Sequence, residues 1–272
     1  MNIVAMELKR RMRGMLIWSA VISGIMILFL AFFPSFKNSG MMELLNTKLD
    51  ALPEGFLQAM NLNSVDFSDI VQYFAYCYQY VLMASCIYAA ILGAGALVEE
   101  ESEGTISFLY AKPLSRTNIV SAKLLGIFVT YWLFAVITGA LSMLLCVFFK
   151  PAETDTLQML SSLKLVFVYG FAMELVYLSI GFLISIALHT LKQATPISIG
   201  IFFVSYFAGI ASKLTANAEF LHWFAPVLYF EPAEVVKSGY APDTGFLIVT
   251  AALIVVPILL SYVFYNKKDL RA

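Results

Sequence analysis

Charged residues are scarce in this sequence, and their scarcity indicates the solvent in which the chain folds. Of its 272 residues, 13% are charged and 61% are hydrophobic, and the mean hydropathy is +0.84. An ordinary soluble domain carries about 25% charged residues. This deficit excludes a water-soluble fold and predicts that most of the chain lies in a lipid bilayer. The net charge of −1 gives no indication of nucleic acid as a partner.

Residues that serve metal and catalytic chemistry are also few. The three cysteines, Cys77, Cys86 and Cys146, lie in apolar runs without metal-ligand spacing, so we interpret them as small buried side chains. The two histidines, His189 and His222, are far apart in the sequence, which disfavours a shared metal site. The motifs GxxxxGK[S/T], HExxH and GxSxG do not occur. We therefore predict no metal site, no cofactor and no catalytic centre in this chain.

Long uncharged runs are what the sequence has in abundance. A transmembrane helix needs about 20 consecutive apolar residues, and six segments of the chain provide them. We therefore expect an all-α integral membrane protein with a single transmembrane domain over residues 1–272. The predicted spans are 15–33, 70–98, 119–149, 163–188, 194–212 and 244–265.

The segments that flank the spans predict their orientation. Residues 1–14 are basic and predict a short amphipathic start in the cytoplasm, whereas 34–69 and 213–243 are predicted extracellular segments with short helices. With both termini inside, eleven of the 17 Lys and Arg residues fall on the cytoplasmic side and six on the outer side. Positive residues favour the cytoplasmic side of a membrane. The sequence therefore predicts cytoplasmic N- and C-termini.

The most polar stretch, residues 99–116, lies between the second and third predicted spans on the predicted cytoplasmic side. It opens with four carboxylates, those of Glu99, Glu100, Glu101 and Glu103. Acidic side chains stabilise the N-terminal end of a helix, where the backbone dipole is positive. The carboxylates therefore predict the start of a short helix.

The residues behind these carboxylates continue the pattern. Ile106, Leu109 and Tyr110 are spaced i, i+3, i+4 and predict one apolar helix face. Pro113 disfavours helix at the residue before it, and Ser115 is a predicted N-cap for the third span. A simple connector between two spans does not need this order of residues. We therefore expect a helix that lies across the membrane surface and serves as a docking element.

The same segment, EEESEGTISFLYAKPLSRTNIVSAKLL, resembles the signature region of type-2 ATP-binding cassette (ABC) exporter permeases. Within it, Lys123 follows Arg116 at the position expected for that family. The six-span layout and the stretch WFAPVLYFEP (223–232) resemble the family more loosely. The resemblance in the signature region covers about a tenth of the chain. The matching residues are Glu101, Glu103, Gly104, Thr105, Ile106, Leu109, Pro113, Leu114, Ser115 and Arg116.

The resemblance implies a function and a set of partners. In that family this segment is the coupling helix, which sits in a cleft of the ATPase subunit. It implies that the chain is the permease subunit of an exporter driven by a separate cytosolic ATPase, which binds ATP and Mg²⁺. It also implies a second permease copy or a relative as partner, and a location in the cell membrane, here a bacterial cytoplasmic membrane. The implied ATPase-docking residues are Glu99, Glu100, Glu101, Glu103, Gly104, Thr105, Ile106, Leu109, Pro113, Ser115 and Arg116.

Glu174 is the formal charge that lies well inside a predicted span. A carboxylate there is costly, so it either contacts the transported substrate or an ion, or makes an interhelical hydrogen bond. This residue leaves an ion-coupled secondary transporter as one alternative function. A membrane-embedded enzyme or an assembly subunit without transport activity is another. Secondary transporters usually contain internal repeats and several intramembrane charges, whereas this sequence has one such charge and no clear repeat.

Overall fold

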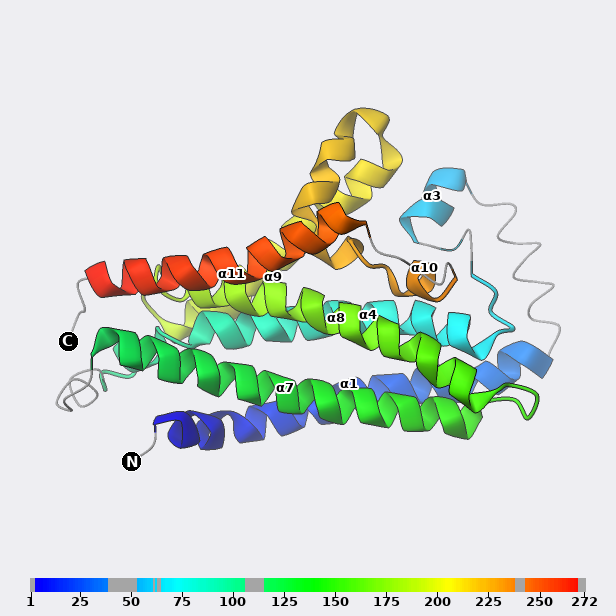
Figure 1. Cartoon of the computed structure of the whole chain (residues 1–272), viewed down its shortest axis with the longest axis horizontal. Helices are drawn as coiled ribbons and strands as arrows, with labels where there is room; N and C mark the ends of the chain where they lie inside the picture. Colours follow the sequence, from blue (N-terminus) through cyan, green and yellow to red (C-terminus); the bar gives the residue numbers. More distant parts are fainter. Residues whose placement is uncertain are drawn as a thin grey trace.

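The structure is a computed structural model, in which the described part of the chain is helical (Figure 1). Six of its helices are long and apolar enough to cross a membrane, which confirms the predicted six-span, all-α fold. These helices are α1 (Ile3–Asn38), α4 (Ile70–Gly95), α7 (Arg116–Phe149), α8 (Thr156–Ile184), α9 (Ala194–Leu214) and α11 (Thr244–Lys267). The structure describes residues 3–38, 53–60, 62, 65–105, 115–237 and 243–268.

Shorter helical elements connect the long ones. Two lie at the end of the bundle opposite the chain termini, namely α3 (Glu54–Ala59) and α10 (Pro232–Lys237) (Figure 1). The others are α5 (Glu99–Ser102) and the 3₁₀ helices η1 (Leu191–Gln193), η2 (Ala216–Phe224) and η3 (Pro226–Leu228).

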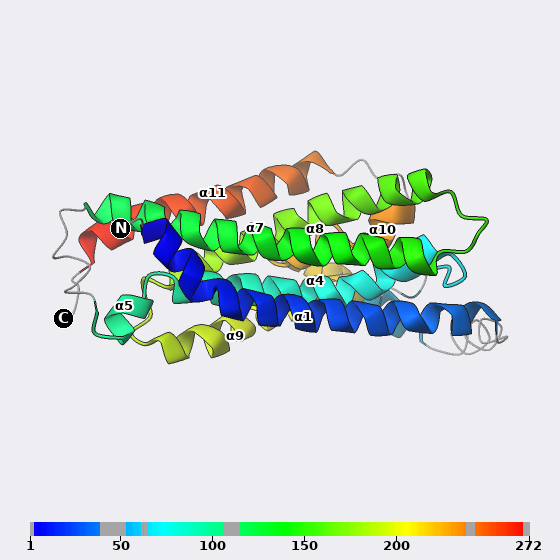
Figure 2. The same cartoon turned by 90° about the horizontal axis from the view of Figure 1, so that it is seen from below.

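Two helix pairs form the bundle: α4 packs along α8, and α1 packs along α7 (Figure 2). Glycines allow α4 and α8 to approach closely, because a Cβ atom on Gly93 would overlap the carbonyl oxygen of Leu178, and one on Gly181 would overlap that of Ala90. Small residues commonly permit such backbone contact between membrane helices. Helix α11 then packs on α8, and α9 packs on α4.

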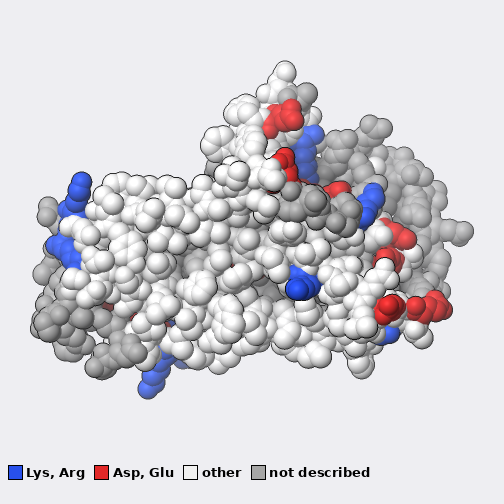
Figure 3. Space-filling model, viewed as in Figure 1, with Lys and Arg blue, Asp and Glu red and all other residues white. Residues whose placement is uncertain are grey.

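Both chain ends and α5 lie at the same end of the bundle (Figures 1 and 2). An even number of crossings requires this, and the six spans provide it. On the face drawn in Figure 3, the conspicuous charged side chains at this end are Lys and Arg, whereas most Asp and Glu side chains lie toward the opposite end, together with further Lys and Arg. A broad surface with few charges separates the two ends, as a protein surface in contact with lipid requires.

The first helix differs from its prediction. We expected a separate amphipathic start over 1–14 and a span over 15–33, but α1 is continuous from Ile3 to Asn38 and contains Pro34. Proline removes one backbone hydrogen bond and strains the preceding turn; near the end of a long helix, the remaining bonds tolerate that loss. The basic first turns belong to α1 and bend relative to its remainder (Figure 2).

The predicted N-cap of the third span is confirmed. Helix α7 begins at Arg116, and the Ser115 hydroxyl accepts a hydrogen bond from the backbone N–H of Asn118 at 3.2 Å. A side-chain oxygen at this position satisfies one of the four free N–H groups of a helix start. Helix α8 is capped in the same way, because Asp155 accepts from the N–H of Leu157 at 2.9 Å.

The segment after α9 folds back on that helix. Element η2 packs along α9, and together they project from the side of the bundle (Figure 1). An ion pair between Lys213, near the end of α9, and Glu231, just before α10, links these two elements. The short helix α10 then returns to pack on α4 and α8. The predicted extracellular segment over 213–243 therefore contains helical structure. The predicted extracellular segment over 34–69 contains the short helix α3.

Candidate functional site

Charged side chains from three elements meet at the end of the bundle that carries the chain termini. We call this group the ion-pair cluster. It lies where the first turns of α1, the segment from the end of α4 through α5, and the start of α7 come together (Figure 2). Its members are Glu7, Arg10 and Arg11 of α1, Glu99, Glu100 and Glu103 of the α5 segment, and Lys123 of α7.

Lys123 occupies the centre of the cluster and is 1% exposed. Its ammonium group donates to the carboxylate of Glu100 at 2.6 Å, to that of Glu7 at 3.2 Å, and to the carbonyl oxygen of Ala96 at 2.7 Å. An ammonium group has three hydrogens to donate, and all three have acceptors here. One buried cation therefore joins α1, the end of α4 and α7.

Two arginines of α1 complete the cluster. Arg11 bonds Glu7 at 3.2 Å and Glu99 at 2.6 Å. Arg10 lies 3.4 Å from Glu99 and 3.2 Å from Glu103. Residues three and four positions apart share one face of a helix, so Glu7, Arg10 and Arg11 approach the α5 segment together. Burial raises the pKa of the Glu99 carboxyl, although both arginines act in the opposite direction.

The carboxylates of Glu7, Glu99 and Glu100 also lie close enough together to consider a metal ion, with ligand atoms within 4.8 Å of one another. The Lys123 ammonium and the Arg11 guanidinium already bond these oxygens. Each of these buried carboxylates therefore has a cationic partner, as a buried charge requires. The geometry therefore fits an ion-pair network, not a metal centre.

A second set of bonds connects the same region to the end of α11. Lys268 bonds the Glu101 carboxylate at 2.7 Å. Arg116 donates to the carbonyl oxygens of Tyr265 at 3.2 Å, Asn266 at 3.1 Å and Lys268 at 2.7 Å. The last carbonyls of a helix have no partner within the helix, so a basic side chain is a favourable cap. The α5 segment and the start of α7 are thereby both attached to α11.

The remaining sequence-predicted site residues lie on the surface or outside the described part of the chain. Glu103, Gly104 and Thr105 are exposed. Gly104 adopts a φ of +68°, a left-handed conformation that favours glycine. The N–H of Thr105 bonds the carbonyl oxygen of Glu100 at 2.9 Å and ends α5. The predicted docking residues Ile106, Leu109 and Pro113 lie outside the described residues.

The cationic partners of these carboxylates were not predicted from the sequence. Glu99, Glu100 and Glu101, which the resemblance implies as docking residues, each bond a cation of the same chain. Two signals were available in the sequence. Glu7 is the single acid in a basic segment, and Lys123 is the single charge between Arg116 and Lys150.

Glu174 lies far from the cluster in sequence, near the middle of α8, and is 4% exposed. The hydroxyl groups of Tyr131 and Ser85 lie beside its carboxyl group. It also lines a groove of about 410 Å³ between α7 and α8. Glu174 therefore lies against neighbouring helices, as an interhelical contact requires, and also lines a groove.

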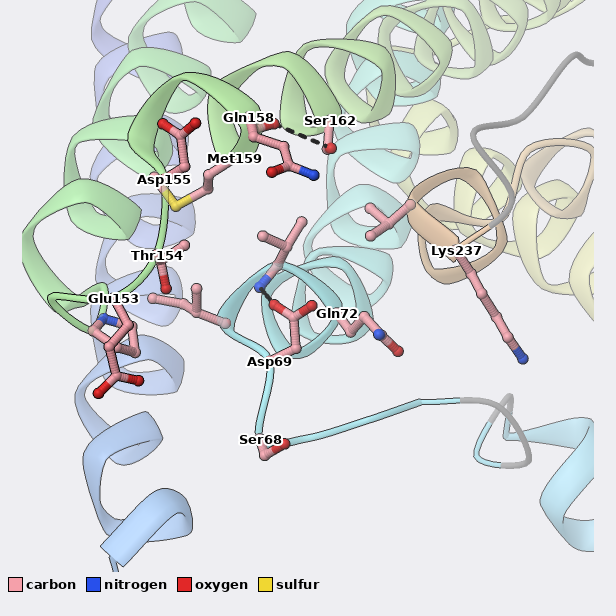
Figure 4. Close-up of a pocket in the computed structure, with 14 residues that line it drawn as sticks. Ser68, Asp69, Gln72, Glu153, Thr154, Asp155, Gln158, Met159, Ser162 and Lys237 are labelled. Atoms are coloured by element: carbon pink, nitrogen blue, oxygen red, sulfur yellow. Dashed lines mark hydrogen bonds between the residues drawn. The ribbon is translucent and has the colours of Figure 1, made fainter.

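A polar cavity of about 530 Å³ lies at the opposite end of the bundle, between the starts of α4 and α8 and the end of α10 (Figure 4). Its acidic side chains include Asp69 and Asp155, which accept hydrogen bonds from the backbone N–H groups of Val71 at 2.8 Å and Leu157 at 2.9 Å. These two aspartates therefore serve as helix caps.

Comparison with known proteins identifies the family. The family described as "ABC-2 family transporter protein" matches residues 1–270, which is almost the whole chain. Comparison with curated protein sequences gave no match. The family match agrees with the six spanning helices and with the resemblance found in the segment that begins at Glu99. The chain belongs to the ABC-2 transporter family and is a multi-pass membrane permease of an ABC transporter.

Proposed function

We propose that this permease forms the pathway for export driven by ATP, and that a separate cytosolic ATPase docks at the end of the bundle that carries the ion-pair cluster. One observation carries the proposal: the α5 segment is bonded to α1 and α7 through the cluster, and to α11 through Lys268. A partner that moves α5 therefore moves three spans. ATP and Mg²⁺ bind in the ATPase, since this sequence has no phosphate-binding loop.

The cluster transmits motion because its centre is buried. Lys123 and Glu7 are 1% and 0% exposed, so neither charge can exchange its partner for water without a large cost in free energy. The link from Glu100 to Lys123 acts on α7, and the link from Glu99 to Arg11 acts on α1. The pair α1 and α7 then shifts relative to the pair α4 and α8. The grooves between α7 and α8 leave space for this shift.

Docking uses the exposed part of the signature region. Glu103, Gly104 and Thr105 present polar groups to the solvent beside the buried carboxylates. The docking roles of Ile106, Leu109 and Pro113 remain predictions of the resemblance. Glu99, Glu100 and Glu101 act one step behind the contact surface, as the side chains that pass its motion to the spans.

The orientation follows from charge. The end with the cluster also carries both termini and the basic first turns of α1, so we place it in the cytoplasm. The end of the bundle that carries α3 and α10 then faces the outside of the cell, and the spans cross the cell membrane.

Two permease copies, or this chain and a relative, form the complete pathway with two ATPase subunits. Apolar side chains exposed on α1 and α7, such as Phe32 and Phe148, face either lipid or the second copy.

The direct test is purification of the permease in detergent from its native membrane, followed by assay of the preparation for a soluble ATPase. We expect an ATPase to co-purify, and the complex to hydrolyse ATP. Reconstituted permease that transports a substrate without any ATPase would contradict the proposal. That result would favour the ion-coupled alternative that uses Glu174.

Reversal of one exposed charge should weaken docking without disturbing the fold. Glu103→Arg changes a side chain that is 43% exposed and removes its ion pair with the partly exposed Arg10. Such surface pairs contribute at most about 1 kcal/mol, so the protein should remain folded. A like charge placed against a complementary surface costs binding free energy. We expect at least about tenfold weaker association with the ATPase, equivalent to about 1.4 kcal/mol, measured by pull-down titration.

The matched control is Glu153→Arg, which makes the same change at an exposed position at the opposite end of the bundle. It should leave association unchanged. If the wild type and the Glu103→Arg protein bind the ATPase equally well, the docking surface does not include this position.

A further inference from the structure

The groove between α7 and α8, which we call the lateral groove, has the size and shape of a small-molecule site. Its volume is about 410 Å³, within the range of about 300–1,000 Å³ that ligand pockets occupy. Trp132, Val136 and Val168 beside it are exposed, so the groove opens on the apolar outer surface of the bundle. Its lining residues are Tyr78, Trp132, Ala135, Val136, Thr138, Gly139, Ala140, Met143, Lys164, Phe167, Val168, Phe171 and Glu174.

Sequence explains why the groove is present. Helix α7 packs mainly on α1, and α8 packs mainly on α4, so α7 and α8 meet along a short contact. On the side that faces α8, α7 carries the small residues Ala135, Gly139 and Ala140. A Cβ atom on Gly139 would have Phe167 as its nearest neighbour at 3.6 Å, an ordinary contact. Small side chains at helical spacing thus leave an open space between two large aromatic walls.

One carboxyl group lies in this apolar groove. Glu174 is 4% exposed and forms no ion pair with any residue that the structure describes. The hydroxyl groups of Tyr131 and Ser85 lie beside it but carry no charge, and the Tyr131 hydroxyl donates its one hydrogen to the carbonyl oxygen of Ser85 at 3.0 Å. Lys164, the cation among the lining residues, is ten positions earlier on α8, about 15 Å along the helix axis. The carboxylate therefore lacks a neighbouring cation inside the bilayer, where an unpaired charge is costly.

The walls of the groove favour the same kind of ligand as the carboxylate does. Tyr78, Trp132, Phe167 and Phe171 supply aromatic rings. The face of an aromatic ring attracts a cation, and the attraction is stronger in a site from which water is excluded. An apolar body would fill the volume, and a positive centre would neutralise Glu174. An anion of the same shape would be repelled by this carboxylate.

We propose that the lateral groove binds a lipophilic organic cation, such as a quaternary ammonium or phosphonium compound, that enters from the bilayer and places its charge beside Glu174. The binding site lies within one chain and stands apart from the proposed function. Only the further step, that the bound cation is an exported substrate, rests on that function. Binding to the permease alone therefore tests this inference, and ATP hydrolysis by the complex tests the other.

The probe is tetraphenylphosphonium, whose permanent charge does not depend on pH. Its binding is measured with radiolabelled compound on the permease in phosphatidylcholine nanodiscs, with empty nanodiscs as the background. The matched comparison is tetraphenylborate, an anion of the same shape. We expect saturable binding of the cation and no saturable binding of the anion. Saturable binding of both ions alike would show an apolar groove without charge selection and would overturn the proposal, as would absence of saturable binding of the cation.

Two variants distinguish the contribution of the Glu174 charge to cation binding from that of the space in the lateral groove. Glu174→Gln should weaken cation binding at least tenfold, and Gly139→Leu, which fills the groove and retains the carboxylate, should abolish it. Glu219→Gln makes the same chemical change on the exposed surface of η2 and should have no effect. Unchanged binding in Glu174→Gln contradicts the proposal. If that variant does not fold, the Gly139→Leu result and the comparison of the two ions still decide the question, since unchanged binding in Gly139→Leu places the ligand elsewhere.

Discussion

Replacing Lys123 by methionine should destabilise the permease by about 3–5 kcal/mol, because breaking a buried ion pair leaves an uncompensated charge. The substitution keeps a long apolar side chain but removes the donor to Glu7, Glu100 and the carbonyl oxygen of Ala96. A typical protein is stable by about 5–15 kcal/mol, so this loss is a large part of the total. The free energy of unfolding in mixed detergent micelles measures it.

Two further variants test the physical reason for this loss. Lys192→Met makes the same change at an exposed position of η1 and should cost little. Adding Glu7→Gln and Glu100→Gln to Lys123→Met should recover part of the stability, because the unpaired carboxylates are then neutral. If Lys123→Met is no less stable than Lys192→Met, the ion-pair cluster does not hold the helices together.

Gly93→Ala and Gly181→Ala should each destabilise the contact between α4 and α8 by about 3 kcal/mol, at the upper end of the usual cost of overpacking. The added methyl group of each variant meets backbone atoms of the facing helix, which cannot rotate away as a side chain can. The helices must therefore separate along their length. Alanine favours a helix by about 1 kcal/mol relative to glycine, and this gain is too small to offset the loss.

The control substitutions are Gly24→Ala and Gly200→Ala, where an added Cβ atom would meet nothing within 4 Å. These variants should be neutral or slightly stabilised. The double variant of Gly93 and Gly181 should cost less than the sum of the two single changes, because neighbouring substitutions share one displacement. Thermal unfolding of the wild type and the five variants, followed by circular dichroism, would measure the order of their stabilities. A Gly93→Ala protein as stable as Gly24→Ala would show that α4 and α8 do not touch as closely as described.

Much of the fold was accessible from the sequence because it depends on local properties. Each spanning helix satisfies its own backbone hydrogen bonds, so the length of an uncharged run predicts a span whatever its neighbours are. Ser115 was predicted as an N-cap for the same reason, since its bond to Asn118 involves residues three apart. The continuation of α1 past Pro34 was not predicted, because a proline near a helix end is compatible both with a helix that stops there and with one that continues.

The order of residues that begins at Glu99, together with the six uncharged runs, was enough to indicate the family. The number of spans, their places in the chain and the family follow from such local patterns. What the carboxylates bind was decided only by the tertiary structure, because their burial and pairing depend on which helices are neighbours. Lys123 and Glu7 are 116 positions apart, and the packing of α1 on α7 brings them together. The groove that contains Glu174 has the same origin, because a space between two helices belongs to neither of their sequences alone.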